Sequence, residues 1–250
     1  MTLSIPMPEK INKPRKKRVT ALNDMGIPLG EVKSYLESYA EFIDIAKFGI
    51  GSAFIEPLLA EKLELYQSFN IKVYFGGTLF EKAYQNNQVT EYIDFCKHHH
   101  LDFIEISCGS LDIPFEDRLS AVKQARSHLT PIAEVGSKDR DAIVSAKAWL
   151  QEIDIFLDQG VEYVILEGRN SASAGIYDSN GQLDLSLIED ITKQQPIDRL
   201  IFEAPKPTNQ AQFINMFGPN VNLGNVNLRD IVVLEAQRNG LRYDTFHLNF

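Results

Sequence analysis

Short apolar runs and longer amphipathic stretches follow one another along the whole chain. The short runs are rich in Val, Ile, Leu and Phe, as buried strands are, and each is followed by apolar residues at helical spacing. The expected strands are Val19–Asn23, Ile43–Phe48, Ile71–Phe75, Phe103–Ser107, Ile132–Val135, Tyr163–Glu167, Leu200–Glu203 and Val221–Leu223. The expected helices are 29–40, 54–69, 81–99, 115–128, 140–159, 184–194, 209–216 and 228–239.

Eight consecutive strand–helix units predict an α/β fold of the (β/α)8 TIM-barrel type. The chain has 250 residues, of which 44% are hydrophobic, so it can bury the core of one large domain. In this fold the strands are parallel, and the loops at their carboxyl ends carry the active site. We therefore expect a single barrel domain over residues 19–250.

The charge of the chain is unevenly distributed. The formal net charge is −9, yet the first 18 residues are basic. The basic residues in this segment are Lys10, Lys13, Arg15, Lys16, Lys17 and Arg18. An acidic body repels phosphate chains, and no aromatic residue is interleaved with these lysines. We expect a solvated, flexible tail over residues 1–18 and no nucleic-acid partner.

Features of export and membrane insertion are missing from the sequence. No apolar run approaches the roughly 18 to 20 residues that span a bilayer, and the N-terminus lacks the apolar region of a secretory signal. Cys96 and Cys108 are the only cysteines, as is typical of a reducing compartment. We expect a cytoplasmic protein with no membrane partner.

Four of the expected strands end in or near a glutamate. These residues are Glu105, Glu134, Glu167 and Glu203. They recur about once per strand–helix unit, which would gather them at the mouth of the barrel. A single glutamate after a strand is more often a helix cap or a salt-bridge partner. Four carboxylates in one ring repel one another, so either some are protonated or cations lie among them, and such oxygen ligands suit Mg²⁺ or Mn²⁺.

Cationic and amide side chains near the strand ends indicate an anionic substrate. Lys47 alternates with Ile43 and Ile45, so it shares their face of a strand and requires a partner or a ligand there. Glycines let a ligand approach the backbone closely, and asparagine side chains donate hydrogen bonds. The loop after the last barrel strand is a common phosphate site of this fold. A glycine pair such as Gly76–Gly77 is, however, more often just a turn. The candidate anion contacts are Lys47, Gly77, Thr78, Arg169, Asn222, Gly224 and Asn225.

A set of motifs in order resembles the phosphosulfolactate synthase family. The motifs are KFGIGS, YFGGTLFEKAY, EIS, EVGSK, EGR, LIFEAP, VNLGNV and GLRYDTF, and they extend from about Val19 to Phe246. The resemblance implies a (β/α)8 barrel that uses Mg²⁺ to add sulfite to phosphoenolpyruvate, giving (2R)-O-phospho-3-sulfolactate. Phosphoenolpyruvate and sulfite would then be the small-molecule partners.

The resemblance also implies roles for individual residues. The glutamates would hold Mg²⁺, and Lys138, in the EVGSK segment, would protonate C2 of the substrate. Lys206 is the competing catalytic lysine, because it also follows an expected strand. The chain departs from the family pattern at Ile50, Cys108 and Asn170, which border the expected mouth. These departures bear on the recognition of sulfite.

Two alternatives of other classes stay open. The family includes plant heat-stress-associated homologues, so a non-catalytic binding or protective protein fits the same barrel. A Schiff-base aldolase would use Lys138 or Lys47 as its nucleophile. The sequence leaves open which sulfonate pathway would be served. It also leaves open the oligomeric state, a homo-oligomer included.

Overall fold

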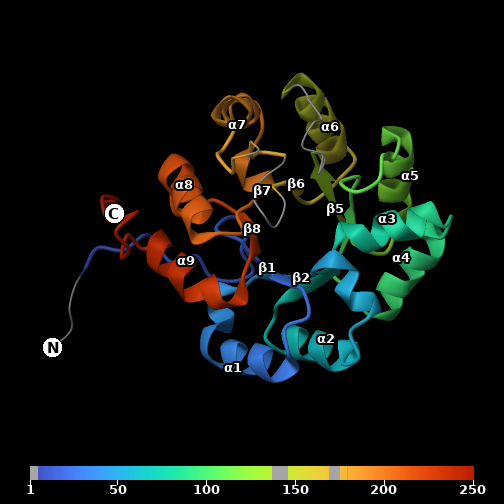
Figure 1. Cartoon of the computed structure of the whole chain (residues 1–250), viewed down its shortest axis with the longest axis horizontal. Helices are drawn as coiled ribbons and strands as arrows, with labels where there is room; N and C mark the ends of the chain where they lie inside the picture. The colour runs from blue at the N-terminus through green and yellow to red at the C-terminus, as the bar shows by residue number, and fades with distance from the viewer. Residues whose placement is uncertain (1–4, 137–145, 169–174, 179) are drawn as a thin grey trace.

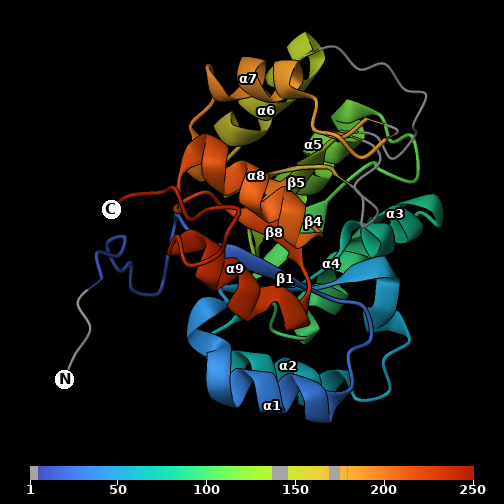
Figure 2. The same cartoon turned by 60° about the vertical axis from the view of Figure 1, so that its left-hand side comes forward.

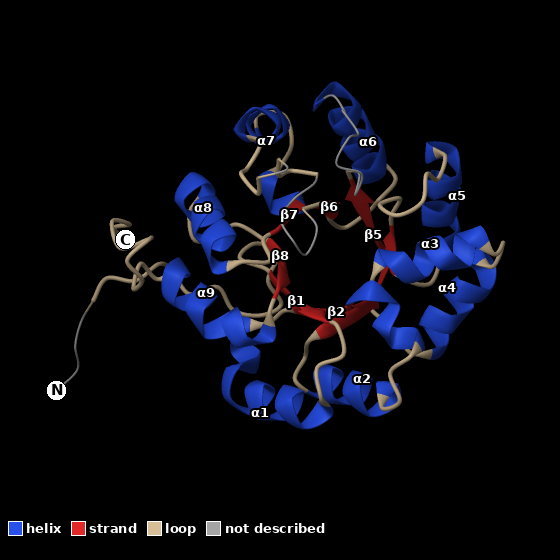
Figure 3. Ribbon diagram, viewed as in Figure 1, coloured by secondary structure: helices blue, strands red, loops and turns tan. Residues whose placement is uncertain are grey.

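The computed structural model describes residues 5–136, 146–168, 175–178 and 180–250. Its strands form a ring that is enclosed by helices (Figures 1 and 3). The strands are β1 Thr20–Asp24, β2 Ile45–Phe48, β3 Lys72–Phe75, β4 Phe103–Ile106, β5 Thr130–Val135, β6 Val164–Leu166, β7 Leu200–Glu203 and β8 Leu223–Val226. The helices are α1 Leu29–Tyr39, α2 Leu59–Ser68, α3 Gly77–Gln85, α4 Val89–His98, α5 Phe115–Ala125, α6 Ala146–Asp158, α7 Leu185–Thr192, α8 Pro207–Phe217 and α9 Ile231–Arg238. Short 3-10 helices are η1 Ala40–Phe42, η2 Gly49–Phe54, η3 Ile197–Arg199 and η4 Leu228–Asp230.

The sheet has the order β3-β2-β1-β8-β7-β6-β5-β4, and its paired strands are parallel. β3 and β4, at the two ends of this order, lie side by side, so the sheet is a nearly closed barrel. This arrangement confirms the predicted (β/α)8 fold. All the carboxyl ends of the strands therefore meet at one end of the barrel.

Two apolar layers hold the barrel together. The larger layer lies between the strands and the helices, and the smaller one fills the interior of the barrel. The interior residues are Val19, Ala21, Ile45, Tyr74, Phe103, Ile132, Tyr163, Ile165 and Ile201. Because strand side chains alternate, a residue two positions after such a side chain also faces inward, nearer the carboxyl end. Lys47 follows Ile45 in this way, and Glu105 follows Phe103.

The expected helix over residues 81–99 is instead two helices. α3 begins earlier, at Gly77, and α4 begins at Val89. Asn87 lies between them with a φ of 55°, a left-handed conformation that asparagine tolerates at the end of a helix. The apolar periodicity continues through this turn, because both helices bury a face against the same barrel.

The last strand is also displaced from its expected position. β8 spans Leu223–Val226 rather than Val221–Leu223, so the glycine that was expected to end the strand lies inside it. A Cβ atom at Gly224 would lie 2.9 Å from Cγ2 of Ile201 on the neighbouring strand. The close packing of β8 against β7 therefore requires glycine at this position.

Part of the basic N-terminal segment packs against the barrel. Arg15 donates to both carboxylate oxygens of Asp44 at 2.8 Å, and the Arg18 guanidinium pairs with Glu235. The N-terminal and C-terminal segments lie on the same side of the barrel, next to α9 (Figure 2). The expected solvated tail therefore does not describe Arg15 and Arg18, whose charges are matched by the buried carboxylate of Asp44 and the half-buried carboxylate of Glu235.

No helix in the described ranges combines the length and the apolar character needed to cross a bilayer.

Candidate active site

A cavity of about 370 Å³ opens at the carboxyl ends of the strands. Its lining residues are Asn23, Lys47, Gly49, Ile50, Gly76, Gly77, Thr78, Glu105, Ser110, Glu134, Glu167, Glu203 and Asn225. Each of the eight strands supplies at least one of these residues from its last positions or from the residue that follows it. The barrel topology therefore brings together residues that lie far apart in the sequence.

Three of the glutamates form the acidic centre of this cavity. Glu134, Glu167 and Glu203 each offer a carboxylate oxygen, and these oxygens lie within 4.8 Å of one another. Their exposed fractions are only 2%, 0% and 2%. Glu105 lines the same cavity but lies outside this group of three among the described residues. Like charges at such separations in a buried site favour a bound cation or a shared proton.

Lys47 is the cation at the edge of this acidic centre. Its Nζ donates to Oε1 of Glu203 at 2.9 Å, and the backbone N–H of Gly168 donates to Oε2 of the same carboxylate at 3.0 Å. Burial alone would lower the pKa of Lys47, but attraction to Glu203 and to the neighbouring carboxylates outweighs it and raises the pKa well above its usual value. The residue is therefore an ammonium group that points at carboxylates. This contact supplies the partner that its strand position requires.

Backbone amides and an asparagine side chain that could bind an anion also line the cavity. Gly76, Gly77 and Thr78 form the beginning of α3, where the backbone N–H groups carry a partial positive charge. Asn225, at the end of β8, has a φ of 55° and is 7% exposed. Its Oδ1 has no hydrogen-bond partner within the described part of the chain. A ligand in the cavity would contact both sets of groups.

The structure separates the sequence-predicted residues into two sets. Lys47, Gly77, Thr78, Asn225 and the four glutamates line the cavity, whereas Lys206 is exposed at the N-terminus of α8 and Gly224 lies within β8. Lys138 and Arg169 lie outside the described residues. Gly136, the residue after β5, has a φ of 120°, a backbone conformation that favours glycine.

Asn222 does not lie at the expected end of the barrel. It precedes β8, and its side chain accepts from the N–H of Val19 and donates to the carbonyls of Asp198 and Leu200. These hydrogen bonds, each of 2.9 to 3.1 Å, tie together chain segments at the amino ends of the strands. The prediction of a mouth position is wrong because the strand begins two residues later than expected.

Sequence reasoning missed several of the lining residues. Asn23 is a polar residue at the end of a buried strand, the same signal that identified the glutamates. Ile50, which the sequence placed at the border of the mouth only as a departure from the family pattern, lines the cavity from a left-handed backbone position with a φ of 52°. Ser110 lies in a loop whose path depends on a distant helix, so no local pattern indicates it.

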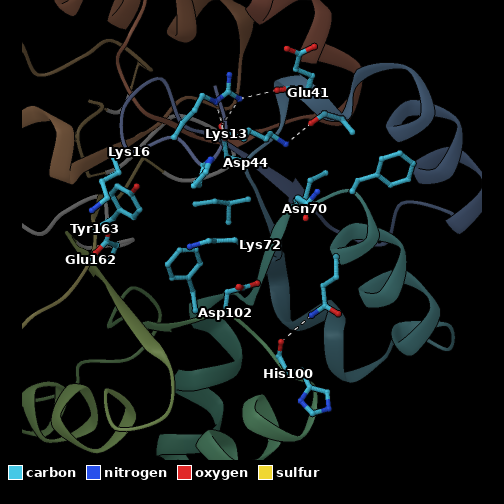
Figure 4. Close-up of a pocket in the computed structure, with 18 residues that line it drawn as sticks. Lys13, Lys16, Glu41, Asp44, Asn70, Lys72, His100, Asp102, Glu162 and Tyr163 are labelled. Carbon is cyan, nitrogen blue, oxygen red and sulfur yellow. Dashed lines mark hydrogen bonds and ion pairs between the residues drawn. The ribbon is translucent and has the colours of Figure 1, made fainter. Parts of the chain in front are cut away.

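A larger cavity, of about 850 Å³, lies at the opposite end of the barrel (Figure 4). Its walls include Lys13, Arg15, Asp44, Lys72 and Tyr163. Arg15 and Asp44 neutralise each other there, and Lys13 donates to a backbone carbonyl at 2.7 Å. Active sites of this fold lie at the carboxyl ends of the strands, so the smaller, acidic cavity is the candidate active site despite its size.

The fold and this cavity define a single-domain (β/α)8-barrel protein with an acidic candidate active site. Residues 8–244 match the model of the family described as (2R)-phospho-3-sulfolactate synthase (ComA). The chain belongs to this family. It is 37% identical over 248 residues to the phosphosulfolactate synthase of Bacillus subtilis, covering 98% of each chain. It is also 37% identical to the phosphosulfolactate synthase of Methanocaldococcus jannaschii, covering 92% of this chain and 94% of the relative.

Solved structures of low sequence identity share the barrel. The YdjI aldolase of Escherichia coli K12 superposes with a TM-score of 0.56 at 11% identity, over 89% of this chain and 78% of the aldolase. The 3-hexulose-6-phosphate synthase of Salmonella typhimurium gives a TM-score of 0.55 at 9% identity, over 88% of this chain and all of the synthase chain. At such identities the likeness concerns the fold alone.

Proposed function

We propose that this chain is a carbon–sulfur lyase that adds sulfite to phosphoenolpyruvate and forms (2R)-O-phospho-3-sulfolactate. The observation that carries the proposal is the convergence of Glu134, Glu167 and Glu203 beside Lys47 in one cavity. Family membership over nearly the whole chain supports the choice of reaction. The cavity, of about 370 Å³, is large enough for a substrate of this size.

The carboxylates fit a hard divalent cation such as Mg²⁺. Their oxygens are close enough to converge on one ion, and the donor set contains oxygen rather than sulfur. A bound Mg²⁺ would act as a Lewis acid toward the substrate carboxylate. In this proposal Glu134, Glu167 and Glu203 each offer one oxygen to the ion, and Glu203 also accepts hydrogen bonds from Lys47 and Gly168.

The anionic groups of phosphoenolpyruvate would bind beside the acidic centre. The ammonium group of Lys47 and the backbone N–H groups of Gly77 and Thr78 present positive charge to the cavity. The side-chain amide of Asn225 can donate a hydrogen bond while its backbone remains at the end of β8. These groups would hold the substrate with its reactive double bond in a fixed direction.

The reaction needs one new bond and one proton. The sulfur lone pair of sulfite forms a bond to C3, the electrons of the double bond move to C2, and a proton is delivered to one face of C2. We assign this proton to Lys138, which follows the last residue of β5 by three positions. A lysine can release its proton near neutral pH when its environment lowers its pKa, whereas the guanidinium of Arg169 cannot.

The test is product formation by the purified full chain. Incubation with phosphoenolpyruvate, sulfite and Mg²⁺ should convert the enol phosphate signal into that of a saturated phosphate ester, observed by ³¹P and ¹³C NMR. A Glu134→Gln variant is the matched control, because it removes one charge from the acidic centre with little change in volume. If the parent forms no sulfonate, the chain does not catalyse this reaction, and a binding or protective role gains support.

The Schiff-base alternative requires an uncharged lysine. Lys47 does not meet this requirement, because Glu203 and the other carboxylates keep its amine charged. Trapping with borohydride in the presence of a carbonyl substrate tests the remaining candidate, Lys138. A covalent adduct on Lys138 would favour the aldolase reading over the addition of sulfite.

A further inference from the structure

Glu81 lies on α3 and binds the loop that follows β4. Its side chain accepts three hydrogen bonds, and the residue is 3% exposed. Oε1 accepts from Oγ of Ser107 at 2.5 Å and from the N–H of Gly109 at 2.9 Å, while Oε2 accepts from the N–H of Ser110 at 2.7 Å. One buried carboxylate therefore holds three donors from one short segment.

Gly77 lies one helical turn before Glu81 and faces the same segment. Residues four apart lie on one face of a helix, so both positions point toward the end of β4. A Cβ atom at Gly77 would lie 2.1 Å from Oγ of Ser107 and 2.5 Å from Oε1 of Glu105. The absence of a side chain at Gly77 lets α3 approach β4 closely enough for Glu81 to reach the loop.

Both of the segments that Glu81 joins line the candidate active site. The first turn of α3 contributes Gly76, Gly77 and Thr78, and the loop contributes Ser110. Glu81 is not among the described residues that line this cavity. Any effect of this carboxylate on a substrate must therefore pass through the groups that it holds.

The type of hydrogen bond separates this contact from an ordinary helix-to-loop contact. Two of the three donors are backbone N–H groups, so these hydrogen bonds fix the path of the loop backbone and not only the side chain of Ser107. A buried carboxylate that accepts N–H and O–H groups makes strong, charge-assisted bonds. If it is removed, the N–H of Gly109 loses its acceptor in a buried setting and the N–H of Ser110 loses its acceptor in a part-buried one.

We propose that Glu81 is a positioning residue that fixes one wall of the cavity, formed by the start of α3 and Ser110, where an anionic group of phosphoenolpyruvate binds. The inference rests on the proposed synthase function. It gives a physical reason for the Gly-Thr-Leu-Phe-Glu sequence of residues 77–81. Gly77 allows α3 to lie close to the end of β4, and Glu81 then forms hydrogen bonds to the loop that follows β4.

The test compares Glu81→Gln with the parent in steady-state kinetics. The substituted amide keeps the volume but places an N–H₂ group where an acceptor is needed, so one loop N–H loses its partner. The KM for phosphoenolpyruvate should rise about tenfold, as expected for the loss of one charge-assisted hydrogen bond. The kcat and the KM for sulfite should change by less than about threefold, since the held wall contacts the anion rather than the reacting atoms.

Tyr84→Phe is the matched control on the same helix. Tyr84 donates to Oδ2 of Asp117 on α5, which also joins α3 to a neighbouring segment, but this contact is exposed and lies away from the cavity. Its removal should leave both KM values unchanged. A double-mutant cycle with Ser107→Ala should be less than additive in the KM for phosphoenolpyruvate, because both changes loosen the same hydrogen-bond network between α3 and the loop.

The outcomes distinguish the two proposals. An active parent whose KM for phosphoenolpyruvate is unchanged in Glu81→Gln overturns the positioning role, even if the melting temperature falls. If Glu81→Gln does not fold, Ser107→Ala alone decides the question. Its KM for phosphoenolpyruvate should rise by about twofold to threefold. A KM equal to that of the parent overturns the inference. A parent without synthase activity instead contradicts the proposed function, and the inference then falls with it.

Discussion

The two ends of the barrel differ in the groups that surround their buried charged side chains. At the amino ends of the strands, Arg15 makes two hydrogen bonds to Asp44, and the buried guanidinium of Arg238 donates to the carbonyls of Pro219, Val221 and Val19. At the carboxyl ends, three carboxylates approach within 4.8 Å, and Lys47 is the cation among the described residues that line the cavity. The amino end pairs individual buried cations with a carboxylate or with carbonyls, whereas the carboxyl end brings several carboxylates together beside one ammonium group.

This difference indicates what each end contributes. Paired charges at the amino ends fix the fold, because the removal of one partner leaves the other buried and uncompensated. Carboxylate oxygens that lie within 4.8 Å of one another at the carboxyl ends favour a bound cation or a shared proton. A cluster of like charges in a cavity is better explained by ligand binding than by folding.

Metal removal should produce the largest effect. Activity with phosphoenolpyruvate and sulfite should fall to background in excess EDTA and return when Mg²⁺ is added beyond the chelator, because the acidic centre needs a hard cation. Product formation by NMR measures the result. The melting temperature should rise on addition of Mg²⁺, since an ion that binds the native state stabilises it. Full turnover in chelator would contradict the assignment of the glutamates.

Loss of the proposed proton donor comes next. Lys138→Met should keep phosphoenolpyruvate binding and lower kcat by about 100-fold or more, the usual loss when a general acid is removed. Lys206→Met is the matched control, because Lys206 also follows a strand but is exposed outside the cavity. If Lys206→Met is inactive while Lys138→Met turns over like the parent, the two roles are reversed.

A smaller effect is expected at the edge of the acidic centre. Lys47→Ala should raise the KM for phosphoenolpyruvate by about tenfold, because it removes one cation from the anion-binding wall. Lys82→Ala, on α3 but outside this cavity, should behave like the parent. An unchanged KM in a folded Lys47→Ala protein would show that the pair with Glu203 is structural.

The smallest effect on catalysis should come from the opposite end. Asp44→Asn breaks the buried pair with Arg15, so the free energy of unfolding should fall by about 3 kcal/mol, with kcat and KM near those of the parent. Denaturant titration measures the loss. Glu167→Gln should show the reverse behaviour, with a free energy of unfolding near that of the parent in metal-free buffer and no activity when Mg²⁺ is present. Equal destabilisation in the two variants would remove the contrast between the ends.

The glutamates were accessible from sequence because each sits at the end of a locally recognisable apolar strand. The length of the strand and the alternation of its side chains then place each glutamate, and the barrel topology brings the strand ends together. Asn222 and Gly224 were misplaced because a glycine normally ends a strand, whereas here the contact with Ile201 on the neighbouring strand requires it. That contact is not visible in local sequence.

Lys206 and Ser110 show the second limit. LIFEAPK resembles IAEVGSK as a pattern, but Pro207 begins α8 immediately and leaves Lys206 as the exposed N-cap. Ser110 reaches the cavity because Glu81, 29 residues earlier, holds its backbone. Positions that depend on such distant hydrogen bonds follow only from the three-dimensional structure.

Closure of the ring joins the first and the last parts of the chain. β1 pairs with β8, and Arg18 pairs with Glu235 across 217 residues. During synthesis on a ribosome, β1 therefore lacks one of its two neighbouring strands until nearly all of the chain has emerged. A nascent chain that stops after α8 would expose the free edges of β1 and β7, which are templates for pairing with other chains. Emergence of β8 is thus the step that covers both of these edges.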